Sequence, residues 1–324
     1  MAATIERSDQ QAETKRVPDF FVVGHAKSGT SALDAMLRQH PEIFLSVREP
    51  SFFVPEVRVL KDQPKHPDTL DGYLALFAAA KPEQRMGDVT PSYLWSQTAA
   101  ARIAEVRPDA RIIAILREPA SYLRSFHLEF LRNGIETEKD LRKAIELEPK
   151  RREGKAIPRD SPRPQWLQYS EQVRYVEQLR RYEAAFSREQ MLILIYDDYR
   201  ADNEGTLRRV FRFLGVDESA SFQVLDANPS VLIRSPTLLA TVRSLTLGRS
   251  GMSRALKPAI KALSSKRMRQ RALALQNRAQ RGRPGPPDEE LMRELRRRYK
   301  SEVVALSEYL DRDLVSFWNY DDIG

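Results

Sequence analysis

The stretch of sequence from 19 to 31, DFFVVGHAKSGTS, decides the fold. Its apolar run over Asp19–Gly24 predicts a buried strand, and the pattern of Thr30–His40, which Pro41 ends, predicts a helix. A turn of small residues between a strand and a helix exposes backbone N–H groups at the helix N-terminus, where an anion such as phosphate is stabilised. We therefore expect a strand–loop–helix unit that binds an anion.

The remaining sequence alternates apolar runs with helical patterns, as in a parallel sheet that is covered by helices. Arg111–Leu116 and Met191–Tyr196 predict buried strands, and Met86–Val89 a short one. Helices are predicted over 70–80, 97–106, 119–132, 170–186, 203–214 and 288–309. The expected fold class is α/β, with a P-loop-like central parallel β-sheet flanked by helices and a basic helical insert near the C-terminus.

Composition excludes several classes of protein. The chain has 324 residues and no cysteine, so it can form neither a disulfide framework nor a thiolate metal site. Its 4 His residues show no metal-ligand spacing, and no metal is expected. The apolar runs are too short to span a bilayer, and the first residues lack the apolar region of a signal peptide. We expect a disordered leader over 1–17, a single domain over 18–324 and a cytoplasmic location.

Basic residues are concentrated between Ala227 and Pro287. This segment contains 13 Lys and Arg and no Asp or Glu, so the rest of the chain carries 8 − 13 = −5 charges. Such local basicity indicates an anionic partner. The segment is interpreted as a lid over an anionic ligand, as a peripheral contact with an anionic membrane, or as a solvated helical insert. It lacks the interleaved aromatic residues of RNA-binding surfaces, so no nucleic acid is expected.

The loop over Gly24–Ser31 contains a lysine and three hydroxyl groups but is not a Walker A motif. That motif places Lys directly after its second Gly, whereas here Lys27 precedes Gly29 and Thr30 follows it. An ATP-binding P-loop enzyme is therefore disfavoured. The alternative is a turn without a ligand, but the lysine and the hydroxyl groups serve no packing purpose there.

Two motifs resemble those of sulfotransferases that use 3′-phosphoadenosine 5′-phosphosulfate (PAPS). The order Lys27-Ser28-Gly29-Thr30-Ser31 after a strand resembles the family's 5′-phosphosulfate loop, and Leu116-Arg117-Glu118-Pro119 followed by Ser125 resembles its 3′-phosphate site. Arg117 would stand at the carboxyl end of a central strand, where open α/β sheets bind ligands, and its guanidinium matches phosphate geometry. The resemblance implies that PAPS is bound by Lys27, Ser28, Gly29, Thr30, Ser31, Arg117 and Ser125.

Other stretches resemble the heparan-type carbohydrate sulfotransferases. Arg48-Glu49-Pro50-Ser51-Phe52-Phe53 is similar to the segment that carries their general base, which implies that Glu49 is the base. Phe52 and Phe53 would raise the pKa of Glu49 by desolvation. Lys27 would stabilise charge on the leaving oxygen. His25 and His127 remain rival candidates for the base.

The sequence departs from this family in two places. Val89 stands where the family has a lysine that acts at the acceptor, so a heparan-like polyanion is a less expected acceptor. The family's late loop over PAPS has its nearest counterpart in Arg281-Gly282-Arg283, offset by one residue. We expect sulfuryl transfer from PAPS to a hydroxyl of a carbohydrate or glycolipid. The alternatives are a noncatalytic polyanion-binding module and a nucleotide-dependent phosphotransferase.

Overall fold

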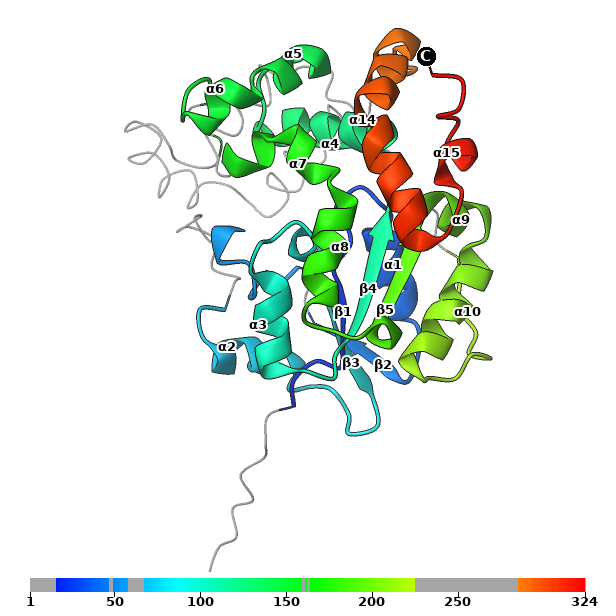
Figure 1. The fold of residues 1–324 in the computed structure, drawn as a ribbon. Coiled ribbons are helices and arrows are strands. Elements are labelled where there is room, and N and C mark those ends of the chain that lie inside the picture. Colours follow the sequence, from blue (N-terminus) through cyan, green and yellow to red (C-terminus); the bar gives the residue numbers. More distant parts are fainter. Residues whose placement is uncertain are drawn as a thin grey trace, which may run out of the picture.

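The computed structural model describes residues 16–46, 49–57, 67–158, 161, 164–224 and 285–323. Within them, five strands form one parallel sheet in the order β2-β3-β1-β4-β5 (Figure 1). The strands are β1 (Phe20–Val22), β2 (Ile43–Leu45), β3 (Arg85–Val89), β4 (Arg111–Leu116) and β5 (Met191–Ile195). Because β1 pairs with both β3 and β4, the loop after β1 lies between the loops that follow these two strands.

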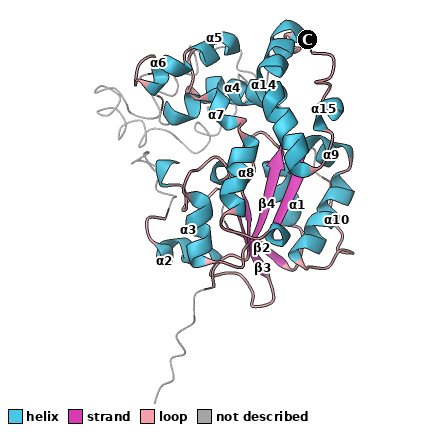
Figure 2. Cartoon of the chain, in the orientation of Figure 1, coloured by secondary structure: helices cyan, strands magenta, loops and turns pink. Residues whose placement is uncertain are grey.

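Helices cover both faces of this sheet (Figure 2). The face toward α1 (Thr30–Leu37) also packs against α9 (Tyr196–Ala201) and α10 (Asn203–Leu214). The opposite face packs against a larger group of helices. The helices that contribute residues to this core are α2 (Leu70–Leu74), α3 (Ala99–Val106), α4 (Pro119–Asn133), α5 (Leu141–Glu146), α7 (Tyr169–Gln172), α8 (Tyr175–Glu183), α14 (Glu289–Leu310) and α15 (Leu314–Phe317). The short helix α6 (Glu148–Arg152) directly follows α5.

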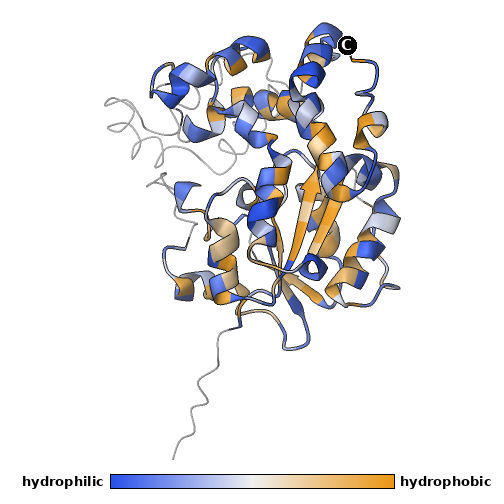
Figure 3. Ribbon diagram, in the orientation of Figure 1, coloured by the Kyte–Doolittle hydropathy of each residue, from blue (hydrophilic) through white to orange (hydrophobic). Residues whose placement is uncertain are grey.

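Side chains of the central strands alternate between the two apolar cores. Phe20 and Val22 of β1 belong to the core on the α1 side, whereas Phe21 belongs to the opposite core. In β4, Ile113 belongs to the core on the α1 side and Ile112 to the opposite core. Because both faces are buried, these strands have continuous apolar sequences. In Figure 3 the arrows of β4 and its neighbour β5 are mostly orange. This confirms the predicted fold class.

The predicted continuous helix over 170–186 is wrong near its start. It is interrupted between α7 and α8, where Arg174 has non-helical angles (φ −78°, ψ 60°). The side-chain amide of Gln178 donates hydrogen bonds to the carbonyls of Glu171 (2.9 Å) and Gln172 (3.4 Å). These are acceptors that a continuing helix would use for its own N–H groups. The side chain of Gln178, from the second turn of α8, therefore takes the place of the backbone N–H donors at the break.

Several sequence predictions fall outside the described residues. These are most of the leader over 1–17, nearly all of the basic segment over 227–287, and Arg281, Gly282 and Arg283. The described chain resumes at Gly285, whose carbonyl accepts a hydrogen bond from Arg124 of α4 (2.6 Å). None of the helices in the described ranges is long and apolar enough to cross a membrane.

Candidate functional site

The loop between β1 and α1 is a tight turn at the carboxyl edge of the sheet. Lys27 (φ 67°) and Gly29 (φ 90°) both have left-handed backbone conformations. A side chain at Gly29 would be strained by this φ and crowded, because a Cβ there would lie 3.0 Å from the ring of Tyr199 and 3.1 Å from that of Tyr196. Gly29 is also the N-cap of α1 and, having no side chain, caps none of its first N–H groups. The loop therefore presents open amides beside Lys27.

Two buried hydroxyl groups at this loop have no hydrogen-bond partner among the described residues. They are those of Ser28, which is fully buried, and of Tyr199, which is 1% exposed. The N–H of Ser28 donates within the loop to the carbonyl of His25 (3.2 Å), so it is the hydroxyl of Ser28, and not its predicted amide, that remains available. An unpaired buried hydroxyl is costly, and a phosphate oxygen would supply its missing acceptor. The loop therefore fits an anion with several oxygens.

Arg117 lies at the carboxyl end of β4, as predicted, and contacts the loop directly. Its Nη1 donates to the carbonyl of Lys27 (2.9 Å), and its Nε donates to the hydroxyl of Ser121 (2.9 Å). The guanidinium also lies 4.8 Å from the ring centre of Tyr196, a cation–π contact. Ser125 follows Ser121 by one turn on the same face of α4 and is buried. Lys27, Arg117 and α4 therefore form one continuous surface.

Glu118 fixes the turn that carries Arg117 through local hydrogen bonds and one from a distant residue. Glu118 caps α4 by accepting hydrogen bonds from the N–H groups of Ala120 (3.1 Å) and Ser121 (2.6 Å). The same carboxylate accepts a hydrogen bond from the hydroxyl of Tyr320 (2.5 Å), near the end of the described chain. These bonds fix the position of Arg117 before any ligand binds.

Lys27 is paired with a carboxylate that the sequence did not reveal. Its Nζ lies 3.4 Å from Glu129 of α4, which also accepts hydrogen bonds from Arg132 (2.5 Å) and Asn133 (2.7 Å). Burial alone would raise the pKa of Glu129, but the cations of Lys27 and Arg132 hold it below its ordinary value. No local motif links residues 102 positions apart, so only the fold shows this pair.

The two histidines considered as bases are structural groups. Nε2 of His25 lies 2.6 Å from the side-chain oxygen of Gln178, and burial lowers the pKa of His25 to about 4. The imidazole of His127 is hydrogen-bonded to the carbonyl of Glu138 (2.8 Å), and burial lowers the pKa of His127 as well. Both rings are buried and occupied by protein partners, so the geometry does not support either as the base.

Glu49 is exposed at the carboxyl edge, with a left-handed backbone (φ 52°). The prediction that Phe52 and Phe53 bury it is wrong. Both rings turn into the core instead, where Phe52 stacks on Tyr73 with ring centres 4.7 Å apart. The charge of Glu49 nevertheless contributes to raising the pKa of Asp88, which places Glu49 near the end of β3.

Asp88 is a fully buried carboxyl group near the carboxyl end of β3. It accepts hydrogen bonds from the hydroxyls of Thr90 (2.6 Å), Tyr73 (2.8 Å) and Tyr93 (2.8 Å). Burial raises the pKa of Asp88 to about 6, although the three hydrogen bonds act in the opposite direction. Ionisation of Asp88 is therefore less favourable in the folded protein than it is for a solvated aspartate.

We expect Asp88 to make the stability of the protein depend on pH. Its pKa is about 6 in the folded protein and 3.8 as a reference, so the folded state binds more protons between these values. The free energy of unfolding should then fall as the pH rises from about 4 to 6, by roughly 3 kcal/mol for this group. Urea unfolding at several pH values should show a shallower fall for Asp88→Asn than for the wild type. Parallel pH profiles of the two proteins would contradict this assignment.

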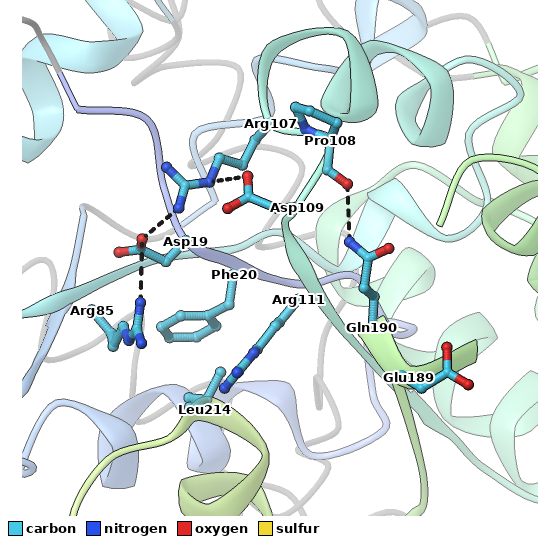
Figure 4. Close-up of a pocket in the computed structure, with 10 residues that line it drawn as sticks. All are labelled: Asp19, Phe20, Arg85, Arg107, Pro108, Asp109, Arg111, Glu189, Gln190 and Leu214. Carbon is cyan, nitrogen blue, oxygen red and sulfur yellow. Dashed lines mark hydrogen bonds and ion pairs between the residues drawn. The ribbon is translucent and has the colours of Figure 1, made fainter. Parts of the chain in front are cut away.

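A cavity of about 620 Å³ lies at the opposite, amino edge of the sheet (Figure 4). Two of its three arginines are paired with carboxylates: Asp19 lies 3.0 Å from Arg107 and 3.9 Å from Arg85, and Arg107 also lies 2.8 Å from Asp109. The third, Arg111, donates to the carbonyl of Phe213. Open parallel sheets bind ligands at their carboxyl ends. We therefore place the candidate site at the loop after β1 and not in this cavity.

Comparisons with known proteins point to one family. A family model described as "Sulfotransferase family" matches residues 18–220. The sulfotransferase structure from Alicyclobacillus acidocaldarius is similar over 93% of this chain and 98% of its own, with a TM-score of 0.64 and 22% sequence identity. This last likeness supports the fold.

Curated relatives match parts of the chain. The heparan sulfate glucosamine 3-O-sulfotransferase 3B1 of Mus musculus is 32% identical over 110 residues, which cover 34% of this chain and 26% of the relative. The bifunctional heparan sulfate N-deacetylase/N-sulfotransferase 4 of Mus musculus is 26% identical over 218 residues, which cover 62% of this chain and 22% of the relative. The chain thus spans about a quarter of the length of the curated relatives it matches.

Proposed function

Because the chain belongs to the sulfotransferase family, we propose that it transfers the sulfuryl group of PAPS to a hydroxyl group of a carbohydrate or glycolipid. The observation that carries this proposal is the buried hydroxyl of Ser28, which has no hydrogen-bond partner in the described part of the chain and lies in the loop that joins Lys27 to α1. An adenosine phosphosulfate offers oxygen acceptors to this hydroxyl and negative charge to Lys27 and the helix N-terminus. Relatives named as acting on heparan sulfate support a carbohydrate acceptor.

The donor would be held at both ends. The 5′ end is assigned to the loop, through Lys27, the hydroxyl of Ser28 and the open amides of Gly29, Thr30 and Ser31. The 3′-phosphate is assigned to Arg117 and Ser125. Support comes from Arg117, which is oriented by Lys27 and Ser121 before any ligand binds. Arg281, Gly282 and Arg283 remain predicted donor contacts that lie outside the described residues.

The proposed chemistry needs a cation and a base. PAPS supplies the sulfuryl group, whose bond to the 5′-phosphate oxygen breaks as its bond to the acceptor oxygen forms. Lys27 stabilises the negative charge that develops on the oxygen of the departing phosphate. Glu49 takes the proton of the acceptor hydroxyl, and it is exposed to solvent at the carboxyl edge of the sheet. Glu129 keeps the ammonium of Lys27 at the site when no donor is bound.

The acceptor is proposed to differ from a heparan-like polyanion. Val89 is buried in the core on the α1 side, so this position supplies no cation to an acidic sugar. The basic segment over 227–287 keeps its two functional interpretations, as a lid or as a contact with anionic membrane. The cytoplasmic location likewise stays a prediction.

Binding of the spent donor tests the proposal. At a concentration of 100 times its Kd, 3′,5′-adenosine bisphosphate should stabilise the fold by about 2.7 kcal/mol. Thermal unfolding should show this stabilisation with the bisphosphate and not with ATP. Equal stabilisation by ATP would favour a phosphotransferase. Salt-sensitive binding of acidic polysaccharide with no nucleotide effect would favour the noncatalytic module.

A further inference from the structure

Trp95 and Trp166 form an aromatic pair beside the candidate site. Their ring centres lie 6.4 Å apart with an interplanar angle of 85°, and both side chains are half-buried. Trp95 comes shortly after β3, and Trp166 lies in a short 3-10 helix over Pro164–Leu167. The pair therefore joins two segments that are distant in the sequence.

The two rings differ in what they contribute to the fold. Trp166 packs against the larger apolar core and stacks on Phe130 of α4, with ring centres 5.9 Å apart and an angle of 9°. Among the described residues, neither apolar core includes Trp95. A large ring that stays half-buried and outside the core adds little to packing, which leaves it available to a ligand.

Two links connect the segments of this pair to the candidate site. Phe130, on which Trp166 stacks, follows Glu129, the partner of Lys27, on the same helix α4. On the other side, the N–H of Leu94, next to Trp95, donates to the carbonyl of Val23 where the loop begins (2.9 Å). Trp166 thus packs on the helix that carries the partner of Lys27, and the segment of Trp95 is bonded to the start of the loop after β1.

Glu56 ties the segment of Glu49 to both tryptophans. Its backbone carbonyl accepts a hydrogen bond from Gln165, the neighbour of Trp166 (2.8 Å), and its carboxylate accepts one from Ser96, the neighbour of Trp95 (3.2 Å). Glu56, seven residues after the proposed base, is therefore bonded to the residues that adjoin the two tryptophans.

We propose that Trp95 and Trp166 bind a sugar ring of the acceptor, an inference that rests on the proposed function. The C–H face of a pyranose is apolar and packs on an indole ring, while its hydroxyls remain available to polar groups. Binding sites of this kind combine aromatic walls with a few polar groups. Glu49 and Lys27 would then meet the reacting hydroxyl at one side of the bound ring.

Intrinsic fluorescence can report on this subsite directly, because the chain has only 3 tryptophans. The third, Trp318, is 4% exposed and donates a hydrogen bond to Asp197 (2.9 Å). We would titrate the protein with hexasaccharides of glucose, of N-acetylglucosamine and of alternating glucuronic acid and N-acetylglucosamine. At least one should change the emission, and at saturating saccharide the change should keep its amplitude in Trp318→Phe but be reduced in Trp95→Ala, where Trp166 alone remains at the subsite to report.

Kinetics with the responding hexasaccharide gives a second readout. Trp95→Ala should raise KM for the saccharide roughly three- to tenfold, the range of an aromatic contact, and Trp95→Phe should restore part of it. The kcat and the stabilisation by 3′,5′-adenosine bisphosphate should stay near wild type. Trp166→Phe, which keeps a ring on Phe130, should act in the same direction as Trp95→Ala.

Several outcomes would overturn the inference. No emission change with any of the three hexasaccharides would do so, as would a change whose amplitude and midpoint are the same in Trp95→Ala as in the wild type. Transfer to phenols or simple alcohols alone would also overturn it, while leaving sulfuryl transfer intact. A wrong assignment of PAPS as the donor would give a different result. The bisphosphate would then not stabilise the protein, even if a saccharide altered the emission.

Discussion

Lys27→Ala should lower kcat for sulfuryl transfer by about 10²- to 10³-fold, because one preorganised charge at a developing anion has an effect of this size. The loop holds the backbone of Lys27 in place, since its carbonyl is bonded to Arg117 (2.9 Å). Alanine has the same backbone constraints at φ 67°, so the loop should keep its shape. Transfer from labelled PAPS under saturating conditions measures the loss.

Lys27→Ala should not leave the carboxylate of Glu129 without hydrogen bonds, so a loss of activity can be assigned to the missing ammonium group. Glu129 retains its hydrogen bonds from Arg132 and Asn133 after Lys27 is removed, so no isolated charge is left. Lys150→Ala, at an exposed position of α6, is the matched control and should retain wild-type turnover. Bisphosphate binding should fall much less than kcat, because the charge on the leaving oxygen develops in the transition state. Unchanged turnover in Lys27→Ala would remove Lys27 from the mechanism.

The strands and the donor loop were accessible from the sequence. Arg111–Leu116 coincides with β4, because an apolar run buried on both faces leaves little choice of structure. Arg117 could be placed at the carboxyl edge from its position directly after that run. Tyr196 could have been found by the same rule, since it directly follows β5.

Contacts between distant side chains were not accessible. The pairing of Lys27 with Glu129 depends on how α4 passes over the sheet, which no local pattern specifies. The break between α7 and α8 depends on Gln178, whose amide bonds to Glu171 and whose oxygen faces His25. The apolar periodicity continues across this break, so the sequence indicated a single helix. Exposure of Glu49 was missed for the same reason, since the direction of Phe52 and Phe53 is a tertiary property.

Arg117→Ala should weaken binding of 3′,5′-adenosine bisphosphate by roughly 10- to 100-fold, the effect of losing one charge-assisted contact. The guanidinium is held by Lys27, Ser121 and the ring of Tyr196. Its Nη2 has no hydrogen bond among the described residues, which leaves a donor for the 3′-phosphate. Calorimetry with the bisphosphate and with adenosine 5′-monophosphate should show that the wild type discriminates between them and that the variant does not.

The ratio of the dissociation constants of the two nucleotides distinguishes direct binding of the 3′-phosphate by Arg117 from an indirect effect of Arg117 on the shape of the loop. Arg117 also binds the carbonyl of Lys27, so its removal can loosen the loop that both nucleotides share. A loosened loop would weaken both ligands equally and leave the ratio intact, whereas a lost phosphate contact weakens only the bisphosphate. Ser121→Ala removes the partner of Nε and keeps the charge, so it should preserve most of the ratio. If discrimination persists in Arg117→Ala, the 3′-phosphate is bound elsewhere and the assignment of Arg117 is wrong.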